Sequence, residues 1–245
     1  MATMSPRLRR AIVLLAAVAM TALTARLGFW QLGRAQQKEA LQSQRETRRG
    51  EPPLAAAELA RTAQAAAAQH DRRIVLAGRW LPQHAVFLDN RPLEGRAGVL
   101  LVMPLELAPG DTVLVQRGWA PRDPVDRSRL PSVPSAPGRV LVEGVVAPPP
   151  GRTLALGAEG RGMLRQNLDP ETFARETGLP LRPLSIRQDE GPPDDGLVRR
   201  WPAPATEVPK HRGYAFQWFA LSSLTVALYV WFQLLGPWWR RRRAA

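Results

Sequence analysis

The chain contains only three histidines, and their surroundings determine what chemistry each imidazole can support. His70 lies at the polar end of an alanine-rich stretch and His84 lies in a Pro-Gln-His turn, so we expect both to be solvated loop residues. The spacing of the three histidines does not form a metal cluster. His211 differs because it stands just before a long uncharged segment, residues 214–235. Its imidazole is therefore the candidate for ligand chemistry.

Two aromatic residues follow His211 at helical spacing. On an α-helix, which turns about 100° per residue, His211, Tyr214 and Trp218 fall within a stripe roughly 60° wide. Imidazole is a common protein ligand of haem iron, and an aromatic wall beneath it suits a flat apolar macrocycle. The same three side chains also favour the headgroup region of a membrane without binding anything. The residues alone leave both interpretations open.

Sequence signatures of catalysis are absent. The chain has no G-x-S-x-G, no H-E-x-x-H and no phosphate-binding glycine loop, so we expect a protein that is not an enzyme. It also has no cysteine, which excludes disulfides, thiolate zinc sites, CxxCH haem attachment and cysteine-based copper delivery.

Two apolar segments lie near the two ends of the chain. Residues 214–236 predict a transmembrane helix, because such a stretch spans a hydrocarbon core of about 30 Å. A buried helix of a soluble protein is the alternative. Residues 11–32 are interrupted by Arg26, whose long side chain can reach toward the interface, and we expect an uncleaved transmembrane helix here. The alternative is a cleaved signal peptide with Ala25 near the cleavage site.

Positive charge flanks both apolar segments. The net charge is +13, and arginines gather in the leader, residues 1–10, and in the tail, residues 237–245. By the positive-inside rule we expect both termini to be cytoplasmic when the first helix is not cleaved, and residues 33–208 to lie on the extracytoplasmic side. The other basic residues are scattered among acids, so we expect membrane lipid and no nucleic acid as a partner.

The middle of the chain predicts a helix followed by many short strands. Helical pattern continues from Gly33 to about Arg48, ends before Pro52-Pro53, and resumes over residues 54–69. Short β-branched and aliphatic runs, punctuated by turn residues such as Pro104 and Pro121, then predict an antiparallel sheet curled into a sandwich or small barrel. These runs are residues 74–76, 85–88, 99–102, 112–115 and 140–142, with weaker ones at 163–168 and 184–187.

One further short helix is indicated between the two weaker strands. Asp169 is a cap, Pro170 follows it, and Gly178 closes two turns. The predicted fold class is an α+β membrane protein, in which N- and C-terminal transmembrane helices flank a mostly antiparallel β extracytoplasmic domain with short helices.

An ordered set of motifs resembles the SURF1/Shy1 family of cytochrome oxidase assembly proteins. No single motif is specific, but the set covers nearly the whole chain. One departure is Lys210, where the family usually has an asparagine before the closing histidine. The motifs are Leu27–Gln31 followed by Arg34 and Lys38, Gly78–Trp80, Asn90–Arg91, Gly98 with Pro104–Leu105, Val113–Pro121, and His211 with Tyr214–Ala215 and Trp218–Phe219.

The resemblance implies an assembly factor for haem-copper (cytochrome c) oxidase in the bacterial inner membrane. It further implies binding of haem a, its presentation to oxidase subunit I, and contact with other oxidase assembly factors. The alternative is a scaffold that stabilises an oxidase intermediate without haem. On the haem interpretation, we expect the cofactor-binding residues to be His211 as iron ligand, Tyr214, Trp218, Trp30 at headgroup depth, and Arg34 as a propionate partner.

Other residues have roles that the sequence leaves open. Arg212 is a second candidate for a propionate. Gln31, near membrane depth, is placed to bond between helices. We expect Gly118 to permit a tight turn at the exit of a strand and so to bury Trp119, while Arg117 either forms an ion pair within the fold or contacts a partner.

Overall fold

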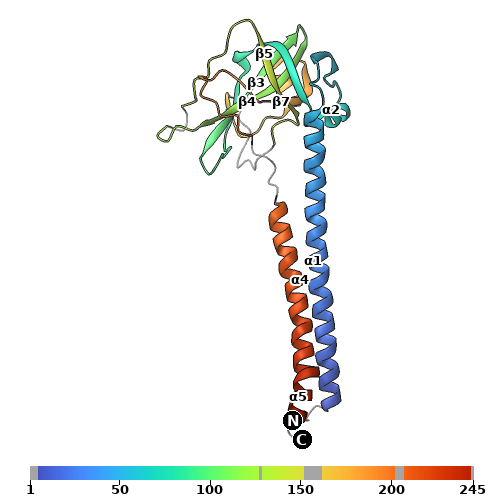
Figure 1. The fold of residues 1–245 in the computed structure, drawn as a ribbon. Coiled ribbons are helices and arrows are strands. Elements are labelled where there is room, and N and C mark those ends of the chain that lie inside the picture. The colour runs from blue at the N-terminus through green and yellow to red at the C-terminus, as the bar shows by residue number, and fades with distance from the viewer. Residues whose placement is uncertain (1–4, 127–128, 152–161, 202–206, 244–245) are drawn as a thin grey trace. The chain divides into compact units, whose positions relative to one another are not determined.

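The computed structural model describes residues 5–126, 129–151, 162–201 and 207–243. The chain forms two compact units, one made of residues 1–44 and 203–245 and the other of residues 45–202. The first is called the helical unit here and the second the β unit (Figure 1).

Two long helices make up the helical unit. Helix α1 (Pro6–Gly50) is continuous, and α4 (Val208–Tyr229) passes through a π-helical segment (Val230–Leu235) into α5 (Gly236–Arg243). Both α1 and the α4 segment are long and apolar enough to cross a membrane. Only 11% of the most apolar window of α1, and none of that of α4, is buried within the protein. Such exposure is typical of lipid-facing helices and differs from the core helix of a soluble protein.

The two helices pack antiparallel along a heptad-spaced seam. Gln31 is hydrogen-bonded to His211 near the start of α4. Thr21, which lies earlier in α1, accepts a hydrogen bond through its carbonyl from Ser222, which lies later in α4. Alternating three- and four-residue steps of less exposed positions produce this seam. They are Ala17, Thr21, Thr24, Gly28, Gln31, Ala35 and Lys38 in α1, and Val208, His211, Ala215, Trp218, Ser222, Thr225 and Tyr229 in α4.

The bounds of these helices differ from the sequence prediction. Helix α4 begins at Val208, so His211 lies within its first turns and not outside it. Pro209 fits this start because the first helical turn requires no N–H from it. Helix α1 begins at Pro6, inside the expected leader, and the predicted continuation beyond Gly33 is confirmed as far as Gly50.

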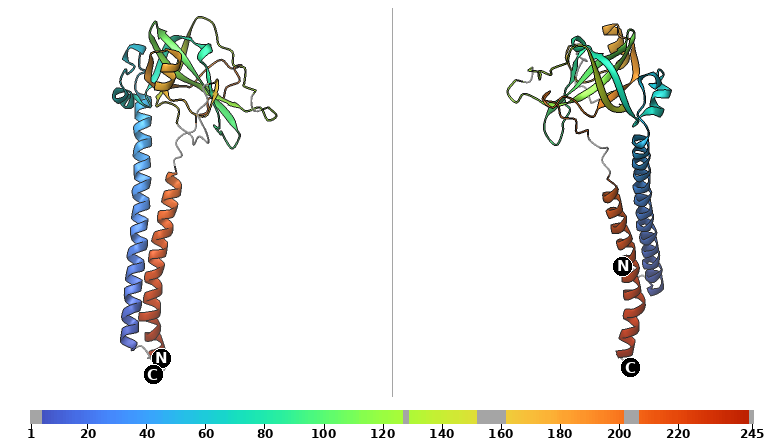
Figure 2. Two further views of the ribbon diagram at one scale, coloured as in Figure 1. Left: turned by 180° about the vertical axis from the view of Figure 1, so that it is seen from behind. Right: turned by 45° about the horizontal axis from the view of Figure 1, so that its top comes forward.

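The β unit contains a seven-stranded sheet in the order β1-β5-β7-β4-β3-β2-β6, with an additional pairing of β1 to β3. That pairing closes β1, β5, β7, β4 and β3 into a small barrel, one of the two predicted architectures (Figure 2). The strands are β1 (Arg73–Trp80), β2 (Val86–Leu88), β3 (Gly98–Ala108), β4 (Asp111–Pro121), β5 (Arg139–Ala147), β6 (Leu164–Arg165) and β7 (Leu181–Gln188).

Strand pairing is mostly antiparallel, as predicted. The exceptions are β4 with β7 and β2 with β6, which run parallel. Fully buried aliphatic side chains such as Leu76, Leu105 and Ile186 fill the core. Because β-branched and aliphatic residues suit a half-buried pleated surface, every run seen in the sequence overlaps a strand. Two runs are only partly strand, since Ala85 precedes β2 and only Leu164 and Arg165 of residues 163–168 form β6.

Two prolines expected to end strands lie inside them. Pro104 is within β3, between the residues paired with β2 (Leu100–Val102) and those paired with β1 (Leu105 and Glu106). At this position β3 changes its partner from β2 to β1, so the missing N–H of Pro104 leaves no hydrogen bond to β1 or β2 unmade. The Pro104 carbonyl still accepts a hydrogen bond from Leu81 N at 3.1 Å. Pro121 is the last residue of β4, where a missing N–H is tolerated.

Short helices complete the β unit. Helix α3 (Pro170–Thr177) confirms the prediction, since the Asp169 side chain accepts from Thr172 N and Gly178 is left-handed at φ 69°. A 3₁₀ turn spans Pro82–His84. The helix expected over residues 54–69 is instead split into a 3₁₀ turn (Ala56–Glu58) and α2 (Ala63–Gln69). The break buries Leu59 in the core and lets Thr62 cap α2.

Candidate functional site

The candidate site begins with the imidazole of His211, which contacts α1. His211 Nδ1 lies 2.7 Å from Gln31 Oε1. A side-chain amide oxygen can only accept, so Nδ1 carries the proton and Nε2 carries the lone pair of the neutral ring. His211 Nε2 is buried and has no hydrogen-bond partner among the described residues. The structure thus presents one unused nitrogen lone pair.

This arrangement is compatible with metal binding by the imidazole. Ligating histidines commonly donate their other ring N–H to an oxygen, which fixes the ring and raises ligand basicity. Gln31, whose role the sequence left open, provides that oxygen. Across the described part of the chain, no group of three or more His, Cys, Asp or Glu could hold a bare metal ion. A single imidazole fits an axial position on haem iron better than a site for a metal ion held by protein alone.

The aromatic residues predicted around His211 separate into two groups. Trp218 is half-buried on the α1-facing side of α4, which it shares with His211. Tyr214 and Trp30 are 51% and 56% exposed, so much of each ring faces outward. Sequence reasoning did not single out Phe29 as a candidate, although its ring meets Phe219 edge-on at 5.1 Å in the same helix pair.

Charged residues surround the Lys210 end of the helix pair. Arg34 is exposed and donates to Gln37 Oε1 at 3.3 Å, a neutral partner on the same helix. Arg212 is ion-paired with Glu39 at 2.7 Å. Between the two arginines considered for a propionate, Arg34 therefore has the less compensated charge in the contacts described.

Glu207 links both helices through lysines. Its carboxylate lies 3.1 Å from Lys38 Nζ of α1 and 3.5 Å from Lys210 Nζ of α4. The hydrogen bond from Lys38 holds the pKa of the Glu207 carboxyl below its usual range. Lys210 thus provides a second cationic contact to Glu207, the residue just before α4.

The other two histidines belong to the β unit. His70 caps the end of α2, its carbonyl accepts from Arg48 at 3.1 Å, and burial lowers the pKa of its imidazole. His84 ends the 3₁₀ turn Pro82–His84. Both are partly exposed and stand in turns, as the sequence predicted.

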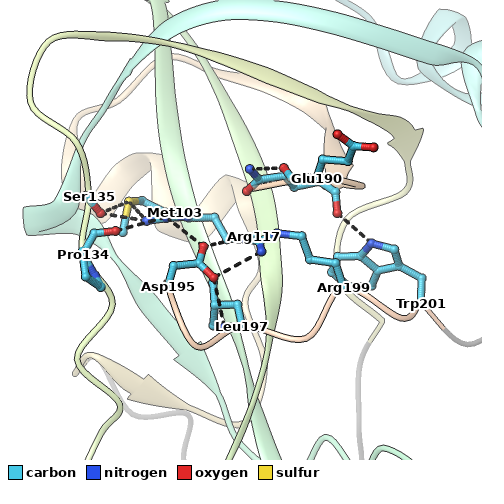
Figure 3. Close-up of polar contacts among 10 residues, drawn as sticks. Met103, Arg117, Pro134, Ser135, Glu190, Asp195, Leu197, Arg199 and Trp201 are labelled. Carbon is cyan, nitrogen blue, oxygen red and sulfur yellow. Dashed lines mark hydrogen bonds and ion pairs between the residues drawn. The ribbon is translucent and has the colours of Figure 1, made fainter. Parts of the chain in front are cut away.

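A buried arginine cluster organises one side of the β unit (Figure 3). Arg117 on β4 is 2% exposed, lies 4.7 Å from the Trp80 ring centroid, and forms an ion pair with Asp195 at 3.7 Å. It also donates to Ser135 Oγ and to the Pro134 carbonyl. Arg117 therefore forms an ion pair within the fold, which was one of the two alternatives for it.

Asp195 was not identified from the sequence, because it lies in a Pro-, Asp- and Gly-rich loop with no periodic pattern. It accepts from Arg199 as well as pairing with Arg117. Gly118 does not form the expected exit turn: it lies inside β4 with φ 153°, and a Cβ there would lie 2.9 Å from Leu197 Cβ. Trp119 is buried as predicted, with its backbone paired to Val198.

Comparison with known proteins agrees with the motif pattern. The SURF1 family model matches residues 18–223, well over half of the chain. A SURF1-like protein of Monosiga brevicollis is 27% identical over 236 residues, covering 90% of this chain and 87% of that protein. A SURF1-like protein of Dictyostelium discoideum is 32% identical over 60 residues, covering 24% of this chain and 22% of that protein.

The matched range includes the β unit and the Gln31–His211 pair. Family membership implies a role in oxidase assembly in general, in a family of assembly factors rather than catalysts. With its two apolar helices, its closed β unit and this match, the chain belongs to the SURF1 family.

Proposed function

We propose that this protein carries haem a during the assembly of a haem-copper oxidase, with His211 as the axial ligand and subunit I of cytochrome c oxidase as the recipient. The observation that carries the proposal is the unused lone pair on His211 Nε2, opposite an Nδ1 that is bonded to Gln31. A buried polar atom without a partner costs roughly 1–3 kcal/mol. A bond from this nitrogen to haem iron would offset that cost.

The same geometry suits a carrier that must also release its cargo. Because protein atoms cover His211 Nε2, a neighbouring side chain must move before a ligand can bind. Release lets that side chain return, which favours transient binding over permanent retention. The protein supplies one nitrogen ligand and leaves the chemistry of the iron to the cofactor.

The surrounding residues have complementary roles in this proposal. Trp218 shares the α1-facing side with His211, while the outward parts of Tyr214 and Trp30 offer apolar surface to the macrocycle or to lipid. Arg34 provides a guanidinium for a haem propionate. We place the protein in the bacterial inner membrane, with the β unit on the extracytoplasmic side and with other oxidase assembly factors as neighbours.

The test is the visible spectrum of the full-length protein purified in detergent from a host that makes haem a. We expect a reduced haem band in the wild type, the same band in His84→Ala, and loss of the band in His211→Ala. His84 is the matched control because it is a partly exposed histidine in a turn of the β unit. Equal haem in the wild type and His211→Ala would overturn the ligand assignment.

A second candidate function is an assembly scaffold that holds an oxidase intermediate without haem. Two ion pairs beside His211, Lys38–Glu207 and Arg212–Glu39, join α1 to the start of α4. They favour the scaffold function because they hold the two helices together at the place where haem would have to enter. Under this function the wild type contains no haem, and His211→Ala still co-purifies with oxidase subunits. The carrier proposal expects haem in the wild type, so one preparation separates the two.

A further inference from the structure

A pocket of about 390 Å³ opens in the β unit where the chain passes from β2 to β3. Residues of this connection, together with the residue after β4 and the residue after β6, line it. The lining residues are Asp89, Asn90, Arg91, Pro92, Gly95, Ala97, Gly98, Arg122 and Gln166. The pocket involves none of the residues assigned to haem, and the inference below does not rest on the proposed function.

Arg91 is held in this pocket by three hydrogen bonds. Its backbone N–H donates to the Gly98 carbonyl at 3.1 Å, and its own carbonyl accepts from Trp119 Nε1 at 2.6 Å. Its Nη2 donates to the Gln166 carbonyl at 3.0 Å, which fixes the plane of the guanidinium. Its Nε is buried and has no hydrogen-bond partner among the described residues. The guanidinium of Arg91 is therefore fixed in position but retains donor capacity for a ligand.

The charge of Arg91 is also uncompensated by the described carboxylates. Of the three charged side chains that line the pocket, Asp89 is ion-paired with Arg122. Arg91 forms no ion pair within 4 Å with any acidic residue in the described ranges. Burial, with no opposing acid, lowers the pKa of the Arg91 guanidinium. The lining thus carries a net single positive charge beside neutral amides.

The loop that forms the pocket wall has a fixed backbone. Leu93 and Arg96 exchange two backbone hydrogen bonds of 3.0 Å each. Asn90, Glu94 and Gly95 adopt left-handed conformations with φ of 55°, 51° and 77°. Because these conformations are already set in the free protein, a ligand would pay little to order the loop.

We propose that this pocket binds the carboxylate of an acidic side chain on a partner polypeptide, with Arg91 as the charged contact. A carboxylate carries one negative charge and matches the single positive charge of the lining, whereas a phosphate dianion would exceed it and would approach Asp89. Planar guanidinium matches carboxylate geometry, and arginine is enriched at protein interfaces. The volume and the Asn90 and Gln166 amides leave room and partners for the peptide groups that flank such a side chain.

The test uses full-length protein in detergent and two capped tripeptides, acetyl-Gly-Glu-Gly-amide and its glutamine counterpart. The reporter is the NMR signal of the Trp119 indole N–H, which donates to the Arg91 carbonyl. We expect the glutamate peptide to shift this signal saturably and the glutamine peptide to leave it unchanged. Arg91→Gln should weaken binding of the glutamate peptide at least tenfold, and Arg91→Lys should weaken it less.

Arg129→Gln is the matched control, because Arg129 has a 78% exposed side chain and lies outside the pocket, so binding should not change. Equal shifts by the two peptides, or unchanged binding in a folded Arg91→Gln, overturn the site. Inorganic phosphate binding more tightly than the glutamate peptide overturns the choice of a carboxylate. Acetate binding as tightly as the peptide overturns the polypeptide partner. The comparison of peptides in the wild type decides the matter even if Arg91→Gln does not fold.

Discussion

The 2.7 Å contact between Gln31 Oε1 and His211 Nδ1 sets the tautomer of an imidazole that the sequence had already singled out. Replacing the amide by a thioether of similar length in Gln31→Met removes the acceptor and frees the ring to rotate or change tautomer. Loss of such supporting contacts typically costs 10–100-fold in affinity. We therefore expect haem titration of the purified Gln31→Met protein to show weaker binding by about this factor.

Gln31→Glu is the control for this experiment because it keeps an acceptor oxygen at the same distance along the side chain. It should bind haem at least as well as the wild type. Wild-type haem affinity in Gln31→Met would show that the hydrogen bond has no bearing on ligation, although His211 could still be the ligand.

Within the β unit, Asp195 is the residue whose side-chain contacts are expected to matter most for stability. It is the carboxylate of the cluster in Figure 3, shared by Arg117 and Arg199. Removing one partner of a buried ion pair costs about 3–5 kcal/mol, because the opposite charge stays buried. We expect Asp195→Asn to lower the free energy of unfolding by about this amount in urea titrations followed by circular dichroism.

The comparison variant for Asp195 is Glu94→Gln, which breaks the exposed ion pair of Glu94 with Arg200. Exposed pairs contribute only about 0–1 kcal/mol, so this change should be small. If both variants lower the free energy of unfolding by the same amount, the buried ion pairs of Asp195 contribute no more to stability than an exposed pair.

At the scale of the elements, the packing of α1 on α4 depends on a glycine. A Cβ on Gly28 would lie 2.7 Å from Phe219 Cε1, whereas a Cβ on Gly33 would meet nothing within 4 Å. Overpacking of this kind costs about 1–3 kcal/mol. Gly28→Ala should therefore destabilise the helix pair, while Gly33→Ala should be neutral or stabilising by up to about 1 kcal/mol.

Thermal unfolding in detergent, followed by near-UV circular dichroism, compares the two glycine variants under identical conditions. Because both substitutions change glycine to alanine in the same helix, helix propensity affects them alike. A Gly28→Ala protein at least as stable as Gly33→Ala would mean that Phe219 adjusts without cost.

The elements differ in how far their sequences predict them. Local patterns are sufficient for α3, whose cap, proline and glycine lie within ten residues, and for strands such as β1 and β5 with their aliphatic runs. The parallel pairing of β4 with β7 is not predictable in this way, because it joins residues about 70 apart and depends on the closure of the barrel.

The same limit explains what was missed in the site. His211 was found from its position, but its bond to Gln31 spans 180 residues. A heptad-spaced row of small residues, Thr24, Gly28 and Ala35 in α1, is the signal that could have placed Gln31 on the shared seam. The prediction of one helix over residues 54–69 was wrong because the alanine-rich composition favours a helix, whereas burial of Leu59 in the core requires a break in it.

At the scale of the whole molecule, the antiparallel packing of α1 and α4 brings the two arginine-rich ends of the chain to the same side. Because Gln31 meets His211 and Thr21 meets Ser222, the start of α1 and the end of α4 lie at the same end of the pair. Arginines gather there, at residues 7–10 and 240–243. The positive-inside rule then assigns both termini to the cytoplasm, which remains a prediction.

The absence of cysteine allows a direct test of this topology. Ser5→Cys introduces a single thiol before α1, and Val125→Cys introduces one at a 94% exposed position of the β unit. In spheroplasts, a membrane-impermeant maleimide should label Val125→Cys without lysis and Ser5→Cys only after lysis. Labelling of Ser5→Cys in unlysed spheroplasts would contradict the assigned orientation.

The Ser5→Cys protein also separates an uncleaved anchor from a signal peptide. An uncleaved α1 keeps Ser5 on the full-length chain, so label appears at full length after lysis. Cleavage near Ala25 would leave the mature chain unlabelled even after denaturation, and it would remove Thr21 and its bond to Ser222. Gly28 and Gln31 lie beyond that point, so a cleaved chain would keep the residues that position His211 but lose most of the apolar part of α1. The proposed topology, in which two helices anchor the protein in the membrane, therefore requires the uncleaved result.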